Sequence, residues 1–302
     1  MTNDILVTGG TGFAGHKLVA DLIADNFNIV VLARQKSSVE SLRRMGAEIR
    51  YGDITNLRSL IEACKGIGTV VHLAASTSSK GADYETSFMV NVVGTQNVID
   101  ACKVNGIRKI IYMGTQSDNP GAYATTKRQA EKLLQDSGLE VITLKPSLIY
   151  GPGGQGLFGD MVSFIEKMPV IPIVGSGKYP MKPIYVGDVA NVTSSCLKRD
   201  NLKTEYFISG PEEIYYKNFL DFIGNAMGLK TRKIHIPYWI VFAGVAIVCR
   251  IYKGFPITAD TLRGLVNPKV YDSNDAERDL DFRPVSLEKG LRLTFANGRG
   301  GE

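Results

Sequence analysis

Short apolar runs alternate with amphipathic stretches along the first half of the chain. We predict the apolar runs to be strands, and they lie at residues 5–7, 29–32, 48–51, 70–74, 110–113 and 141–144. Stretches with helical periodicity follow them, at residues 13–26, 39–45, 57–64, 84–105 and 123–136. This alternation predicts an α/β fold, in which a parallel sheet with right-handed crossovers carries helices on both faces. The strands are apolar almost throughout, which fits a doubly wound sheet buried on both sides.

The pattern changes after Gly151-Pro152-Gly153-Gly154, where glycine and proline become frequent and the alternation lapses as far as Pro183. A strand and a helix start follow at 184–190, with Asp188 as the expected N-cap. The rest of the chain is mixed and largely helical. We therefore expect a large domain over 1–153, to which 184–209 returns, a smaller and mainly helical C-terminal cap over 154–183 and 210–296, and a flexible tail over 297–302.

Composition narrows the possible partners. A net charge of +5 suits anionic ligands, but the basic residues form no stripe with aromatic residues, so we expect no nucleic-acid partner. The four cysteines and three histidines are scattered, which predicts reduced thiols and no metal site. No apolar leader precedes the first strand, so we expect no signal peptide and a cytoplasmic protein.

One segment of the cap, residues 238–249, is uncharged and has basic residues on both sides. It is shorter than the roughly 20 residues that span a bilayer. Runs of this length are more often buried, so the favoured interpretation is a buried cap helix or a dimer face. The alternative is an interfacial helix that makes peripheral membrane contact, with its apolar side in lipid and its basic flanks near the headgroups.

The turn between the first strand and the first helix reads Thr8-Gly9-Gly10-Thr11-Gly12-Phe13-Ala14-Gly15. A helix start offers unpaired N–H groups and the positive end of the helix dipole, which bind a pyrophosphate. Gly9 would form the tight turn, Gly12 would let the ligand approach, and Gly15 would let the helix pack on the strand. An ordinary βα turn is the alternative. The strand before, the helix after and the repeats beyond favour a Rossmann-type dinucleotide site.

The turn after the second strand indicates which dinucleotide the site prefers to bind. An acidic residue here would bind the ribose 2′-hydroxyl of NAD, but the strand ends at Ala33 and Arg34 follows. A guanidinium can bind a 2′-phosphate, and Lys36 and Ser37 add donors, so NADP(H) is favoured over NAD(H). The alternative is a solvated basic turn. Asp53, after the third strand, is placed to meet the adenine edge, or it is a simple turn carboxylate.

Tyr123 and Lys127 have the spacing that puts two side chains on one face of a helix. We expect the ammonium, together with an oxidised nicotinamide, to lower the pKa of the phenol, so that Tyr123 can exchange a proton with a carbonyl or an alcohol. Thr115, just after the fifth strand, is placed to hydrogen-bond the same substrate oxygen. Chance pairs of this spacing are common, and an exposed helical aromatic is the alternative for Tyr123.

With these elements in order, the chain resembles the extended short-chain dehydrogenase/reductase family, also called the NAD(P)-dependent epimerase/dehydratase family. The resemblance covers residues 4–295. Besides the glycine turn and the Tyr123/Lys127 pair, the matching motifs are Gly52-Asp53-Ile54, His72-Leu73-Ala74-Ala75, Asn91-Val92-Val93-Gly94-Thr95, Lys145-Pro146-Ser147-Leu148-Ile149-Tyr150-Gly151-Pro152 and Ile184-Tyr185-Val186-Gly187-Asp188-Val189-Ala190.

The resemblance implies roles for the matching positions. The amides of Phe13 and Ala14 would bind pyrophosphate, Pro146 would lie beside the nicotinamide, and Ser76 and Thr77 would face the substrate in the cap. The whole expected cofactor site is Gly9, Thr11, Gly12, Phe13, Ala14, Gly15, Arg34, Lys36, Ser37, Asp53, Ile54, Leu73, Ala74, Ala75, Asn91, Lys127 and Pro146, with Asp53 and Ile54 flanking the adenine.

Three departures from the family pattern bear on the substrate. Thr115 replaces the usual serine, the loop from Thr115 to Tyr123 is short for a sugar-nucleotide epimerase, and Leu148 replaces a common asparagine. The favoured hypothesis is an NADP(H)-dependent oxidoreductase acting on a carbonyl or secondary alcohol of a small molecule. The alternatives are a sugar-nucleotide epimerase or dehydratase that retains its cofactor, and a non-catalytic dinucleotide-binding subunit that resembles an accessory subunit of respiratory complex I. Family members often pair through two long helices, here 84–105 and 123–136, so we expect a homodimer.

Overall fold

In the computed structural model, residues 4–77, 83–241 and 269–296 are described. A parallel seven-stranded sheet dominates the fold, with the strand order β11-β6-β5-β4-β1-β2-β3. This confirms the predicted Rossmann-like sheet and adds a seventh strand, β11. The strands are β1 (Asp4–Thr8), β2 (Asn28–Ala33), β3 (Glu48–Tyr51), β4 (Thr69–His72), β5 (Lys109–Met113), β6 (Glu140–Pro146) and β11 (Glu205–Ile208).

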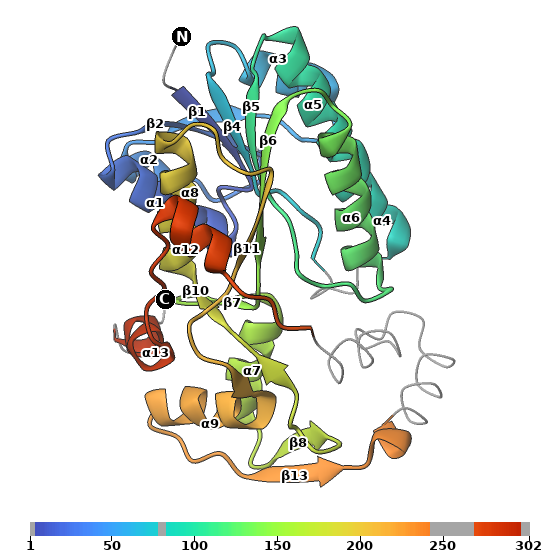
Figure 1. Cartoon of the computed structure of the whole chain (residues 1–302), viewed down its shortest axis with the longest axis vertical. Coiled ribbons are helices and arrows are strands. Elements are labelled where there is room, and N and C mark those ends of the chain that lie inside the picture. The colour runs from blue at the N-terminus through green and yellow to red at the C-terminus, as the bar shows by residue number, and fades with distance from the viewer. Residues whose placement is uncertain (1–3, 78–82, 242–268, 297–302) are drawn as a thin grey trace.

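Helices cover both faces of this sheet (Figure 1). On one face lie α1 (Phe13–Ala24), α8 (Val186–Lys198) and α12 (Asn274–Leu280). On the other lie α3 (Leu57–Ala63), α5 (Gly94–Val104) and α6 (Ala122–Gln135). The short helices α2 (Glu40–Met45) and α4 (Tyr84–Phe88) complete this half of the molecule.

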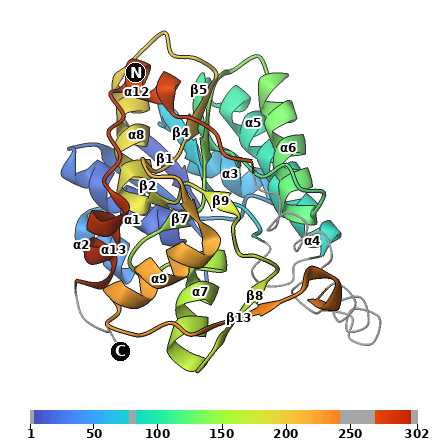
Figure 2. The same ribbon diagram turned by 60° about the horizontal axis from the view of Figure 1, so that its bottom comes forward.

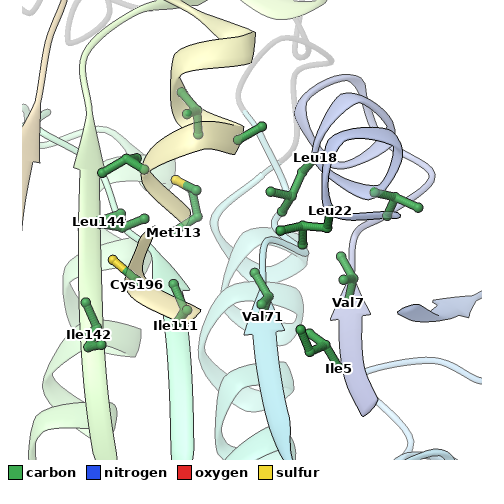
Figure 3. Close-up of a cluster of buried hydrophobic side chains, with 14 of the residues drawn as sticks. Ile5, Val7, Leu18, Leu22, Val71, Ile111, Met113, Ile142, Leu144 and Cys196 are labelled. Atoms are coloured by element: carbon green, nitrogen blue, oxygen red, sulfur yellow. The ribbon is translucent and has the colours of Figure 1, made fainter. Parts of the chain in front are cut away.

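The buried core is divided by the pleat of the sheet. Successive strand residues point to opposite faces, so Val7 packs with Leu18 and Leu22 of α1, whereas Leu6 packs with Val98 of α5. Figure 3 shows the first of these two clusters, where α1 and α8 meet side chains from four strands. Both faces are therefore filled, as the apolar strands predicted.

The remaining elements form the smaller part of the molecule, drawn below the sheet in Figure 1. Its core contains Tyr150, Phe158 and Phe219. Its helices are α7 (Gly156–Lys167), α9 (Tyr216–Ala226) and α13 (Leu287–Phe295). Its short strands pair as β10 (Ile184–Tyr185) with β7 (Ile149–Tyr150), β12 (Ile214–Tyr215) with β9 (Pro180–Met181), and β13 (Lys233–Ile236) with β8 (Ile171–Val174).

Three local expectations differ from the structure. Tyr185 is the N-cap of α8, and Asp188 lies inside its first turn, where it accepts a hydrogen bond from the Val285 amide at 3.0 Å. Residues 84–105 form one helical run interrupted by a π-helix at Met89–Val93. The region where alternation lapses nevertheless contains α7 and β8, because its apolar residues at helical spacing outweigh the flanking glycines.

The apolar run at 238–249 is described only as far as residue 241. Trp239 and Ile240 are exposed, at 71% and 44%, so this part is not buried within the chain, and of the favoured interpretation only the dimer face stays a prediction. Residues 242–249 lie outside the described residues. Among the described helices, we find none of the length and apolar character needed to cross a bilayer.

Candidate active site

The glycine turn lies between β1 and α1, beside the point where the strand order reverses between β1 and β4. Gly9 has a φ of +76°, and a Cβ on it would lie 2.6 Å from the Ala74 backbone nitrogen. A Cβ on Gly15 would lie 2.1 Å from the carbonyl oxygen of Gly9. Gly12 is the N-cap of α1 and has no side chain to occupy the first amides of the helix. These close approaches fit the backbone cradle that binds a pyrophosphate at a helix start.

Phe13 and Ala14, whose amides are predicted to bind the pyrophosphate, also pack against the core of the smaller part of the molecule. Thr11 is exposed at the tip of the turn. The cradle is therefore in direct contact with the part of the molecule that we expect to bind substrate.

His72 holds the ends of β1 and β4 together. Its Nδ1 is 2.6 Å from the Thr8 hydroxyl, and its Nε2 is 3.0 Å from the Thr95 hydroxyl, which donates to the Asn91 carbonyl at 2.6 Å. Complete burial, with a smaller contribution from Lys127, lowers the pKa of His72 to about 3. The imidazole is therefore neutral at physiological pH and acts as a structural link at the switch point.

Asn91 connects the segment after β4 to α6. Its side-chain oxygen accepts from the Ser76 amide at 2.7 Å, while its nitrogen donates to the Ser76 carbonyl at 3.2 Å and to the Thr126 hydroxyl at 2.9 Å. These contacts engage both amide hydrogens of Asn91, so it would support a cofactor by fixing Ser76 rather than through its own NH₂ group. Leu73, Ala74 and Ala75, predicted to line the cofactor, lie between β4 and Ser76; Thr77 follows.

The three residues predicted to carry the chemistry come together at the carboxyl ends of β5 and β6. Thr115 follows β5, and Tyr123 is half-buried at the start of α6, near enough to Thr115 for that side chain to lower the pKa of the phenol. Lys127 lies one turn further along α6 and is 3% exposed. Its Nζ donates to the Met113 carbonyl and lies 4.0 Å from the centroid of the Tyr112 ring. Pro146, at the end of β6, completes this edge of the sheet.

The pKa of Tyr123 is shifted in the direction opposite to our expectation. Burial raises the pKa of Tyr123, and the hydrogen bond with Thr115 offsets only part of this rise. Burial also lowers the pKa of Lys127 to about 7. From the sequence we expected a permanently charged ammonium close to the phenol. In the structure the Lys127 amine donates instead to the Met113 carbonyl.

Gln116 is a polar anchor of this site that we did not single out from the sequence. Its amide nitrogen has three acceptors within reach: the Lys145 carbonyl at 2.9 Å, the Ile208 carbonyl at 3.2 Å and the Ser209 hydroxyl at 2.9 Å. It fixes the segment directly after Thr115 to the ends of β6 and β11. A polar side chain next to a candidate catalytic residue was the signal that could have found it.

A surface pocket of about 320 Å³ lies at the ends of β2 and β3. Arg34 and Asp53 both line it, together with residues that we did not predict. The lining residues are Arg34, Gln35, Tyr51, Gly52, Asp53, Asn56 and Ser59. Lys36 and Ser37 belong to the same turn as Arg34 without lining the pocket; Ser37 donates its amide to the Arg34 carbonyl at 2.9 Å.

Asp53 and Ile54 have local contacts that limit how they could meet an adenine. The Asp53 carboxylate accepts from the Thr55 amide at 2.9 Å and from the Thr55 hydroxyl at 2.8 Å, as a turn carboxylate does. The Ile54 side chain is buried and packs against Gly94. Contacts from Ile54 to a ligand would therefore come from its backbone.

Comparisons with known proteins fit this arrangement. Residues 5–208 match the model of the NAD dependent epimerase/dehydratase family, and the chain belongs to this family of NAD(P)-dependent enzymes. The 2-alkyl-3-oxoalkanoate reductase of Stenotrophomonas maltophilia (strain K279a) is 28% identical, over 97% of this chain and 98% of that protein. The N-acetyl-alpha-D-glucosaminyl-diphospho-ditrans,octacis-undecaprenol 4-epimerase of Escherichia coli O157:H7 is 25% identical, over 98% and 95%.

Among solved structures, the UDP-glucose 4-epimerase of Thermotoga maritima with UDP-glucose is similar, with a TM-score of 0.79 at 22% identity, covering 98% of each chain. At this identity the likeness supports the fold alone. Over the described residues, we find no cluster of histidine, cysteine and acidic side chains suited to hold a metal ion.

Proposed function

We propose that the protein is an NADP(H)-dependent oxidoreductase that interconverts a ketone and a secondary alcohol. The observation that carries the proposal is the placement of Tyr123 and Lys127 one turn apart on α6, with the Lys127 amine bound to the Met113 carbonyl at the carboxyl end of β5, two residues before Thr115. By rule, the ligand of an open α/β sheet binds at this edge near the strand reversal. The glycine cradle stands at the same edge.

The chemistry of the chain's own residues is proton transfer to or from the substrate oxygen. Tyr123 donates the proton when a carbonyl is reduced and accepts it when an alcohol is oxidised, while the Thr115 hydroxyl hydrogen-bonds the same oxygen. Lys127, with a pKa of about 7, can carry a positive charge one helical turn from Tyr123 in one protonation state. When bound, the nicotinamide supplies or takes up the hydride.

Arg34 supports NADP(H) as the preferred dinucleotide. It is exposed at the mouth of the pocket beside β2 and β3, and its guanidinium can bind a phosphate through two parallel hydrogen bonds. The strand before it ends at Ala33, which presents no carboxylate to repel that phosphate.

An apolar carbonyl compound is the substrate class that we favour. The relative from Stenotrophomonas is by name a reductase of 2-alkyl-3-oxoalkanoates, and the match covers nearly the whole length of both chains. The short loop between Thr115 and Tyr123, and Leu148 in place of a polar residue, leave few groups to bind a sugar nucleotide.

The second candidate is an epimerase that keeps its cofactor through turnover, favoured by the full-length match to the Escherichia coli 4-epimerase. The two activities are separated by the fate of the dinucleotide. A reductase consumes NADPH in step with product and exchanges it freely, whereas an epimerase turns over with no net change in a nucleotide that co-purifies with it.

Titration with NADPH and NADH, followed by turnover of a series of 3-oxoacyl compounds, tests the proposal. Tyr123→Phe removes the proton donor and should lower turnover by about 10²–10⁴-fold while nucleotide binding persists. Unchanged turnover would contradict the assigned role of Tyr123.

A second variant tests the nucleotide. Arg34→Ala should weaken NADPH at least about tenfold more than NADH, since each charge-assisted phosphate contact is worth about 1.5–3 kcal/mol. Arg44→Ala, which removes an exposed arginine of α2 that does not line the pocket, is the matched control. Equal weakening of both nucleotides by Arg34→Ala would exclude a 2′-phosphate contact at Arg34.

A further inference from the structure

The end of the molecule farthest from the large sheet is formed by β8, β13 and the chain that enters and leaves them (Figures 1 and 2). We call this region the tip and define it as residues 167–178 and 229–241. The two strands are parallel, with Ile171 opposite Lys233 and Pro172 opposite Ile234. The tip occupies one extremity of the longest axis of the molecule (Figure 1).

Large apolar side chains are exposed along the whole tip. Ile234 is 56% exposed, and its cross-strand neighbour Pro172 is exposed on the same pair of strands. Met168 and Val170 are exposed before β8, and Trp239 is 71% exposed beyond β13. A single exposed apolar residue needs no explanation, but a row of them along one element marks an interaction surface.

The charges of the tip have one sign. Residues 167–178 contain two basic residues and residues 229–241 contain three, and neither stretch contains an aspartate or a glutamate. The Ile171 amide donates to the Arg232 carbonyl at 2.7 Å, which sets Arg232 beside exposed Val170. Lys167, Lys230 and Arg232 are exposed, while Lys233 forms an ion pair with Asp221 of α9. The tip therefore pairs apolar side chains with basic ones and lacks acidic residues of its own.

We propose that the tip docks on the surface of an anionic phospholipid bilayer. Trp239, Ile234 and Met168 enter the boundary between headgroups and acyl chains, where tryptophan is favoured, and the basic residues meet the lipid phosphates. The negative potential at such a surface attracts each basic residue that comes near it. The five basic residues and the lack of any acidic residue in the two stretches of the tip suit a uniformly negative lipid surface. This inference goes beyond the proposed oxidoreductase activity and does not depend on it.

Trp239 reports on this docking without a label, because it is the only tryptophan in the chain. Its emission should shift to the blue on addition of phosphatidylcholine vesicles that contain about 30% phosphatidylglycerol, and brominated acyl chains should quench it. Pure phosphatidylcholine should bind much less protein, and about 1 M salt should release it, because the screening length then falls to about 3 Å.

Two sets of variants assign the binding to the tip. Ile234→Ser with Met168→Ser, and Lys230→Glu with Arg232→Glu, should each lower the vesicle-bound fraction about tenfold in sedimentation. Val104→Ser is the matched control: Val104 is 65% exposed at the end of α5, on the opposite part of the molecule, and its loss should change nothing. Unchanged dinucleotide binding shows that the variants are folded.

Failure of the wild-type protein to bind anionic vesicles, without an emission shift, would overturn the proposal. It would also be overturned by a blue shift that grows with protein concentration in the absence of lipid, together with a dimer in analytical ultracentrifugation. That result would assign the tip to a second copy of the chain.

Discussion

Lys127 and Lys145 are both largely removed from water, but their surroundings differ. The Nζ of Lys145 lies between two carboxylates, 2.7 Å from Glu131 and 2.6 Å from Glu205. The Nζ of Lys127 lies over the face of the Tyr112 ring instead. Burial lowers the pKa of Lys127 to about 7. Burial acts in the same direction on Lys145, but the hydrogen bonds to both carboxylates outweigh it and raise the pKa.

The difference comes from the direction of one side chain on α6. Tyr123, Lys127 and Glu131 follow one another at four-residue spacing, so they share a face of the helix. Glu131 pairs with Lys145 on β6 and reaches Lys127 only as a more distant charge. One lysine thereby joins helix to sheet with a fixed charge. The other can gain or lose a proton near neutral pH, as expected of a group in an active site.

Removing the fixed charge should have the largest effect on stability. Lys145→Met leaves Glu131 and Glu205 facing each other without a cation, and should lower the free energy of unfolding by about 2–3 kcal/mol at pH 7. Urea denaturation measures this loss. The control is Lys132→Met, which breaks an exposed pair with Asp136 and should cost less than about 1 kcal/mol. Equal losses in the two variants would mean that the buried pairs do not join α6 to the sheet.

The titratable lysine should make stability depend on pH. Its pKa is about 7 in the folded protein against an ordinary 10.5, so between these values the unfolded chain binds more protons and stability rises with pH. Below pH 7 the folded protein buries a charged ammonium, and the full desolvation penalty lowers the free energy of unfolding. Relative to Lys127→Met, the free energy of unfolding of the wild-type protein should rise by about 1.4 kcal/mol per pH unit from pH 7 toward pH 10.

Urea denaturation of both proteins at pH 6, 8 and 9 measures this rise in the free energy of unfolding, which should be about 1.4 kcal/mol for each pH unit. If the free energy of unfolding of the wild-type protein, minus that of Lys127→Met, stays constant or falls as pH increases, Lys127 keeps its proton in the folded protein.

The sequence was sufficient to predict elements whose evidence is local. The alternation of apolar runs located the first six strands, with β3 at Glu48–Tyr51 as expected, and the spacing of Tyr123 and Lys127 placed both on α6. The ion pairs of Lys145 with Glu131 and Glu205 could not be predicted from the sequence, because they join residues from β6, α6 and β11. Patterns within a segment reveal which face is buried, but not which distant group that face meets.

The same limit explains the errors at the site and in the smaller part of the molecule. The pKa of Tyr123 depends on where the Lys127 amine points, and the Met113 carbonyl that binds this amine belongs to β5, outside the helix that carries both residues. Aspartate is a residue type favoured at N-caps, yet the Asp188 carboxylate accepts its hydrogen bond from the Val285 amide, about a hundred residues later in the chain. Trp239 belongs to an apolar run typical of a core, but it lies exposed at the tip.

The smallest effect tests whether the two lysines are coupled through Glu131. The Glu131 carboxylate raises the pKa of Lys127, so Glu131→Gln should lower that pKa further, by a few tenths of a unit. The rise of stability with pH should then begin at a lower pH. Glu205→Gln removes the other partner of Lys145 and should leave the onset where it is in the wild-type protein. If both variants move the onset equally, or Glu131→Gln moves it upward, the Glu131 carboxylate is not the charge that raises the pKa of Lys127.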